Sequence, residues 1–173
     1  MKADCYAYLG DIHLFNEDFS KAVEYLNKAI ALDSEFSHYY YLLGMVYQTQ
    51  ENWRRAIEEF EKAVKLEPKN SIYIEELGRT YVFTGNLYEG ERLLKRAWKL
   101  DPTNIGAGVE LTGVQLSLGK FRETLGLIDE ILESGENLHD GIVDYLDTIR
   151  MDANRGLEEK AKRRRKSKKR PKD

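Results

Sequence analysis

The sequence repeats itself every 34 residues, and this period limits the chain to an array of similar structural units. Shifting it by 34 places equivalent positions in five columns, two of leucine, one of glycine, one of alanine and one that is apolar throughout. The columns are Leu9, Leu43, Leu77 and Leu111; Gly10, Gly44 and Gly78; Ala29, Ala63 and Ala97; Leu32, Leu66 and Leu100; and Phe19, Trp53, Leu87 and Phe121. A period of this length indicates stacked units that bury their apolar faces against one another.

Each repeat is predicted to contain two amphipathic helices. Apolar residues follow the spacing i, i+3, i+4, i+7 in residues 40–47 and i, i+4, i+7 in residues 56–63, which is typical of helices with one buried face. The polar residues 50–52 separate the two segments. Pro68 cannot continue a helix, so the second helix should end near it, and Pro102 repeats this signal 34 residues later.

The glycine column predicts a close crossing of the two helices in each repeat. A residue without Cβ allows close approach, and the alanine column does the same on the second helix. We therefore expect that Gly44→Leu would overpack the crossing at a cost of roughly 1–3 kcal/mol.

These features resemble the tetratricopeptide repeat, whose period is 34 residues. Residues 37–70 match its pattern almost throughout. Residues 3–36 match but carry His13 at a tyrosine position and Ser34 at the proline, and residues 71–104 carry Gly90 in place of an alanine. The matching residues are Tyr6, Leu9, Gly10, Ala22 and Ala29; Tyr40, Leu43, Gly44, Tyr47, Ala56, Phe60, Ala63 and Pro68; and Leu77, Gly78, Tyr81, Ala97 and Pro102. The resemblance implies an all-α right-handed superhelix of about four helix hairpins, and it implies no particular partner.

The predicted organisation is a repeat region at 1–138, a capping helix at 139–157 and a disordered basic tail at 158–173. The repeats are 3–36, 37–70, 71–104 and a degenerate 105–138, whose first helix carries Gly106, Gly108 and Gly113. Each glycine costs about 1 kcal/mol relative to alanine inside a helix, so this helix should be the least stable. Residues 142–149 form the apolar face of the cap. No matching cap precedes the first repeat, which leaves open a fragment of a longer array or end-to-end pairing; the oligomeric state stays open too.

No motif predicts catalysis, a metal or a cofactor. His13, His38 and His139 belong to no zinc-binding pattern, and Cys5 has no histidine near it in sequence. Residues 85–90 have the glycine spacing of a phosphate-binding loop but lack the Lys-Ser/Thr that follows it. With one cysteine, no membrane-length apolar run and no secretory pattern, the chain is expected to be a cytoplasmic protein without membrane insertion, or a nuclear one if its source is eukaryotic.

The resemblance also implies which first-helix positions form a concave groove. The groove residues predicted to bind a peptide are Asp4, Tyr8, Asp11, Phe15, Tyr41, Leu42, Met45, Glu75, Glu76, Arg79, Phe83 and Glu110. A surface that combines aromatics and acids suits a basic, amphipathic helix or extended peptide. The alternative is that the aromatics pack on neighbouring helices and the acids only solvate the surface.

Some members of the family clamp a chaperone's C-terminal carboxylate with Lys, Asn and Arg side chains on these helices. Here the corresponding positions are Ala7, Asp11, Leu42, Ile72 and Glu76. Because the cations are missing and acids would repel the ligand, no chaperone-tail binding is expected.

The charge is divided unevenly along the chain. Residues 158–173 hold ten Lys/Arg and three acids, whereas residues 1–157 hold 17 and 27. The basic-tail residues singled out are Lys162, Arg163, Arg164, Arg165, Lys166, Lys168, Lys169, Arg170 and Lys172. This segment could hold nucleic-acid phosphates, direct nuclear import, contact an acidic body, or only aid solubility; phosphorylation of Ser167 would reduce its charge.

The leading hypothesis from sequence is therefore a non-enzymatic protein-protein interaction adaptor or scaffold that uses the groove. The alternative is a nucleic-acid-associated assembly factor whose tail binds RNA or DNA while the repeats recruit a protein.

Overall fold

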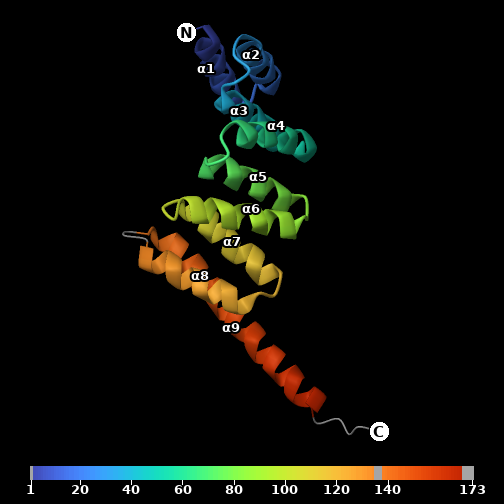
Figure 1. Ribbon diagram of the computed structural model, residues 1–173, viewed down its shortest axis with the longest axis vertical. Coiled ribbons are helices and arrows are strands. Elements are labelled where there is room, and N and C mark those ends of the chain that lie inside the picture. The colour runs from blue at the N-terminus through green and yellow to red at the C-terminus, as the bar shows by residue number, and fades with distance from the viewer. Residues whose placement is uncertain (1, 135–137, 169–173) are drawn as a thin grey trace. The chain divides into compact units, whose positions relative to one another are not determined.

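The computed structural model describes residues 2–134 and 138–168, and all regular structure within these ranges is α-helical. The chain divides into two compact units, Met1–Leu100 and Asp101–Asp173. The first unit contains three helix hairpins (Figure 1). They are α1 (Lys2–Phe15) with α2 (Phe19–Leu32), α3 (Ser37–Thr49) with α4 (Trp53–Leu66), and α5 (Ser71–Phe83) with α6 (Leu87–Leu100).

The glycine column lies where the two helices of each hairpin cross, as predicted. A Cβ on Gly10 would lie 2.7 Å from Leu26 Cγ, and one on Gly44 would lie 2.6 Å from two atoms of the Phe60 ring. In the third hairpin, the Cβ of a substituted Gly90 would lie 3.1 Å from the carbonyl oxygen of Gly78. Gly90 therefore replaces an alanine at a position where backbone approaches backbone, and the departure from the repeat pattern has a packing reason.

The turn inside each hairpin uses one backbone conformation, again at intervals of 34 residues. The residue with positive φ is Glu17 (59°), Glu51 (56°), Gly85 (81°) and Gly119 (68°). The residue after it donates its N–H back to the carbonyl of the residue five positions earlier, as in Asp18 to His13 (2.8 Å). Because a left-handed residue without glycine is strained, the first two turns carry a cost that the others avoid.

The second unit consists of α7 (Ile105–Ser117), α8 (Phe121–Ser134) and α9 (Asp140–Lys168), with α9 packed against both other helices. Leu146, Ile149 and Ala153 form the buried face of α9. Gly113 of α7 has a packing role here, since a Cβ at this position would lie 2.9 Å from Tyr145 Oη of α9.

Helix α9 continues to Lys168, which differs from the expected disorder of residues 158–168. An existing helix extends without the cost of nucleation, and Ala, Lys, Arg and Glu all favour helix. An i,i+4 pair, Glu158 and Lys162 at 3.9 Å, adds to this. The tail residues Lys169, Arg170 and Lys172 lie outside the described residues, as do the side chains of Ser167 and Lys168.

Candidate functional site

Residues of α1 and α3 form a pocket of about 300 Å³, which we call the acidic pocket. It is lined by Asp4, Ala7, Tyr8, Asp11, Phe36, His38, Tyr39 and Leu42. Four of these are predicted groove residues: Asp4, Tyr8, Asp11 and Leu42. The lining contains two carboxylates and no Lys or Arg, and Tyr8 is 72% exposed beside them. A cationic group with an apolar stem fits this combination of charge and aromatic surface.

Tyr39 holds the wall of the acidic pocket in place. Its ring is buried and packs against Phe36 at 4.7 Å between ring centroids. Its hydroxyl donates a hydrogen bond to Asp4 Oδ1 at 2.9 Å. Burial, with this hydrogen bond to an anion, raises the pKa of Tyr39 to about 12. The phenol therefore stays protonated at neutral pH and keeps its donor directed at Asp4.

The acids of α5 have a different environment from those of α1. Glu75 and Glu76 are buried, and Arg79 forms ion pairs with both, at 2.7 Å and 3.0 Å. Gln48 of α3 also donates to Glu76 Oε2 at 3.3 Å. Because buried charges are retained only when they are paired, this cluster stabilises the α3–α5 contact. Of the five predicted groove acids, Asp4 and Asp11 are the ones exposed in the acidic pocket.

Tyr41 packs inside a stack of aromatic rings. Its ring lies between His38 (5.6 Å) and Tyr73 (4.9 Å), and it contacts Phe60 at 6.1 Å. Burial, with Glu76 as the nearest charge, raises the pKa of Tyr41. At this position the structure agrees with the alternative that the aromatics pack on neighbouring helices.

A second pocket of about 310 Å³, the aromatic pocket, is lined by Gln48, Thr49, Trp53, Arg79 and Phe83. Phe83 is 62% exposed and stacks on Trp53 with ring centroids 5.2 Å apart. Both pockets use α3, since the acidic pocket contacts its first half and the aromatic pocket its last turn. A ligand running along α3 could therefore reach both.

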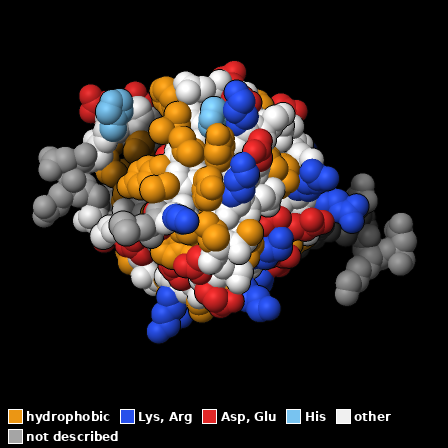
Figure 2. Space-filling model, turned by 90° about the horizontal axis from the view of Figure 1, so that it is seen from above, with side chains coloured by type: hydrophobic (Ala, Val, Ile, Leu, Met, Phe, Trp, Pro, Cys, Tyr) orange, Lys and Arg blue, Asp and Glu red, His pale blue; other side chains and the backbone are white. Residues whose placement is uncertain are grey.

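The remaining groove residues lie elsewhere. Met45 is half-buried on α3. Phe15 is 88% exposed at the end of α1, where Tyr8, Leu9 and Ile12 are exposed as well. Figure 2 shows hydrophobic side chains gathered on the face of the molecule seen from above in Figure 1. Glu110 belongs to α7 in the second unit, so it is not part of either pocket.

The sequence did not single out Phe36, Tyr39 or Trp53 as site residues. Phe36 precedes α3 and Trp53 begins α4, so both lie outside the first helices to which the search was restricted. Tyr39 could have been found from spacing, because it stands three and four residues before Leu42 and Leu43, which are buried with it.

The histidines and the cysteine show no catalytic arrangement. His13 stacks on Tyr25 at 5.3 Å and lies 3.6 Å from Asp18, which agrees with the expected packed histidine. Cys5 is exposed. Within residues 2–134 and 138–168, no group of three or more His, Cys, Asp or Glu is placed to hold a metal ion. Across the same ranges, every helix is too short or too polar to traverse a bilayer.

Comparison with known proteins points to one family. The tetratricopeptide-repeat model matches residues 3–36 and 37–70. A search of curated protein sequences finds no match. Solved structures with a similar fold include MamA, at 21% identity with a TM-score of 0.70, covering 93% of this chain and 94% of that one.

Two further similar structures were solved with peptides or partners. The first tetratricopeptide domain of Spaghetti (RPAP3), bound to the HSP90 peptide SRMEEVD, has 19% identity and a TM-score of 0.65, covering 68% of this chain and 93% of that one. The TPR2B-domain:pHsp70 complex of yeast Sti1 has 16% identity and a TM-score of 0.64, covering 69% and 96%. At these identities the likeness concerns the fold. Together with the 34-residue period and the hairpins with glycine at their crossings, these matches identify the chain as an all-α helical repeat protein of the tetratricopeptide-repeat family.

Proposed function

We propose that the chain is a non-enzymatic interaction adaptor whose face of α1, α3 and α5 binds a protein segment that carries Lys or Arg next to apolar residues. The observation that carries the proposal is the acidic pocket, where Asp4 and Asp11 meet exposed aromatic surface without a lining Lys or Arg. Similar folds bind peptides in the Spaghetti (RPAP3) and Sti1 structures, which supports this use of the fold.

The spacing of the two pockets defines the ligand further. His38 in the acidic pocket and Thr49 in the aromatic pocket are eleven residues apart on α3, which corresponds to about 16 Å of helix. A ligand that fills both pockets needs a cation and an apolar side chain about that far apart. An extended segment of about five residues or a helix of about eleven meets this requirement.

The acidic pocket also supports the expected absence of chaperone-tail binding. A ligand that ends in a carboxylate would meet Asp11 where the clamp needs a donor. Glu76, at another clamp position, is engaged by Arg79. We therefore expect an EEVD-type C-terminal peptide not to bind.

The test is fluorescence anisotropy with the full chain and a labelled 15-residue peptide that presents two Lys and two Leu at this spacing. Its matched probe replaces both Lys with Glu. Asp11→Asn should weaken binding of the Lys peptide at least about fivefold, because a charge-assisted contact is worth about 1 kcal/mol or more. The control is Glu58→Gln, which removes an exposed acid of α4 outside both pockets. Equal binding of the Lys and Glu peptides, or no effect of Asp11→Asn, would contradict the proposal.

A second candidate function is nucleic-acid association through the basic segment, with the repeats recruiting a protein. The observation that favours it is the exposure of residues 161–166 on α9, which leaves their cations accessible to phosphates. Pull-downs with residues 1–173 and 1–157, each with and without nuclease, separate the two candidates. Partners that survive both nuclease and truncation support the groove, whereas partners lost with either support the basic segment.

A further inference from the structure

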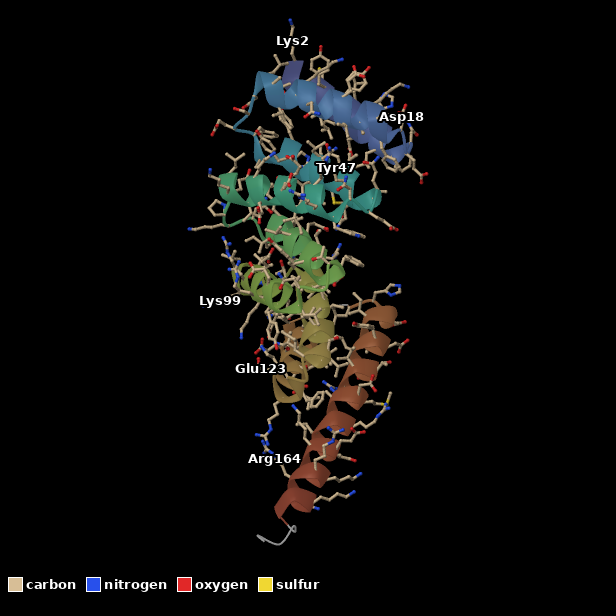
Figure 3. The ribbon with its side chains drawn as sticks, turned by 90° about the vertical axis from the view of Figure 1, so that its right-hand side faces the viewer. Lys2, Asp18, Tyr47, Lys99, Glu123 and Arg164 are labelled. Atoms are coloured by element: carbon tan, nitrogen blue, oxygen red, sulfur yellow. The ribbon has the colours of Figure 1, made fainter. Side chains whose placement is uncertain are left out.

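The start of α8 and the second half of α9 enclose a cleft of about 670 Å³ within the second unit. Its charged lining residues are Lys120, Arg122, Lys160 and Arg164 together with Glu123 and Glu158. Figure 3 labels Glu123 on α8 and Arg164 on α9, which come from the two sides of this cleft. The cations therefore come from two segments about 40 residues apart in sequence, and only one of these segments is rich in basic residues.

Specific contacts hold α9 against the start of α8. Lys160 Nζ donates to the carbonyl oxygen of Gly119 at 2.6 Å and lies 4.6 Å from the centroid of the Phe121 ring. Gly156 allows the close approach, because a Cβ at this position would overlap the same ring. Packing thus positions the cations of the cleft, and local sequence does not.

Beyond the cleft, the cations continue along α9 at high density. Residues 158–168 hold seven Lys/Arg and two Glu, over about 16 Å of helix at 1.5 Å per residue. Duplex DNA carries one phosphate charge per about 1.7 Å of its axis. An extended polypeptide carries at most one charge per about 3.3 Å, so this density matches a nucleic-acid duplex better than an acidic peptide.

The composition of the segment points to a duplex and away from a single strand. Proteins that hold single strands stack the bases on aromatic side chains, and residues 158–168 contain no aromatic residue. Phe121, the aromatic of the cleft, is covered by Lys160.

We propose that the basic cleft, defined as Lys120, Arg122, Lys160 and Arg164 together with the exposed basic residues 162, 163, 165 and 166 of α9, binds the phosphate backbone of a nucleic-acid duplex. This inference rests on the second candidate function and adds to it. The binding surface is formed jointly by α8 and the helical part of the segment, and Lys120 and Arg122 contribute although they lie far from it in sequence.

The test measures binding of the full chain to fluorescein-labelled 20-base-pair DNA and RNA duplexes of mixed sequence by anisotropy, at 50, 100 and 200 mM salt. With about six phosphate contacts, affinity should fall roughly 1,000-fold between 50 and 200 mM. The double variant Lys120→Gln/Arg122→Gln should bind more weakly at 50 mM. It should also reduce the slope of log K against log salt by about two, since each phosphate contact contributes about one.

Three variants and one competitor separate the outcomes. Lys65→Gln/Lys95→Gln removes two exposed cations of the first unit and should bind like the wild type. If Arg163→Gln/Arg165→Gln weakens binding but Lys120→Gln/Arg122→Gln does not, the joint cleft is refuted and the second candidate function stands. If the wild type binds neither duplex at 50 mM, both are refuted. If poly-glutamate competes as well as unlabelled duplex, the surface is a general site for acidic chains and the proposal is wrong.

Discussion

The crossing of α3 and α4 allows a sharp test of the packing, because Gly44 faces the ring of Phe60. A Cβ built on Gly44 would lie 2.6 Å from Phe60 Cδ1 and Cε1 and 3.0 Å from Cζ, whereas ordinary contact is 3.4–4 Å. Phe60 is fully buried, so the ring has no space into which it could move. Even Gly44→Ala, the smallest change, should therefore overpack the crossing.

The expected magnitude combines two opposing effects. Overpacking by about 1 Å against a buried ring belongs at the upper end of the usual range, about 3 kcal/mol. Alanine favours helix over glycine by about 1 kcal/mol. Gly44→Ala should therefore lower the free energy of unfolding by about 2 kcal/mol. For a chain of this size that corresponds to a fall in melting temperature of about 4–8 °C.

Gly126 of α8 provides the matched control. It also lies inside a helix, but a Cβ built there meets no atom within 4 Å. Gly126→Ala should therefore show the propensity gain alone and raise stability by about 1 kcal/mol.

The assay is thermal unfolding followed by circular dichroism, with hydrogen exchange to locate the effect. Exchange should accelerate in α3 and α4 in the Gly44→Ala protein and stay unchanged in α8. Adding Phe60→Leu to Gly44→Ala should recover part of the loss. A Gly44→Ala protein that melts at or above the wild-type temperature, while Gly126→Ala is stabilised as expected, would refute the close crossing.

Three further predictions concern the turns, the buried ion pairs and the pocket wall. Glu51→Gly should raise the urea midpoint by an amount equivalent to about 0.5–1 kcal/mol, because it removes the strain of a residue at φ 56° and loses part of that gain to glycine's entropy; a lower midpoint would contradict the strain. Arg79→Met should cost about 3 kcal/mol in urea unfolding, since it leaves Glu75 buried without its cation, and an unchanged midpoint would show that the pair does not contribute. The pKa of Tyr39 is raised from 10.0 to about 12, so its contribution to stability is complete below pH 10 and is lost as pH rises toward 12; Tyr39→Phe should lose less stability than the wild type between pH 10 and 11.5 in thermal melts, and parallel curves would argue against this.

The sequence alone was sufficient for the fold class and for the repeat. The 34-residue period, the glycine column and the stop at Pro68 are local or periodic signals, and α4 does end at Leu66, just before that proline. The columns report a packing relation that each hairpin repeats, so the self-alignment contained the information on which helices cross closely.

Tertiary structure was needed to distinguish side chains that look equivalent in sequence. Glu75 and Asp11 are both acids on first helices, yet Glu75 is buried against Arg79 and Asp11 lines an open pocket. Likewise, the cations of Lys120 and Lys160 share a cleft because Gly156 admits the ring of Phe121. Helical periodicity specifies the face on which a residue lies. Its charge environment depends on which distant segment packs there, and a single sequence does not encode that contact as a local pattern.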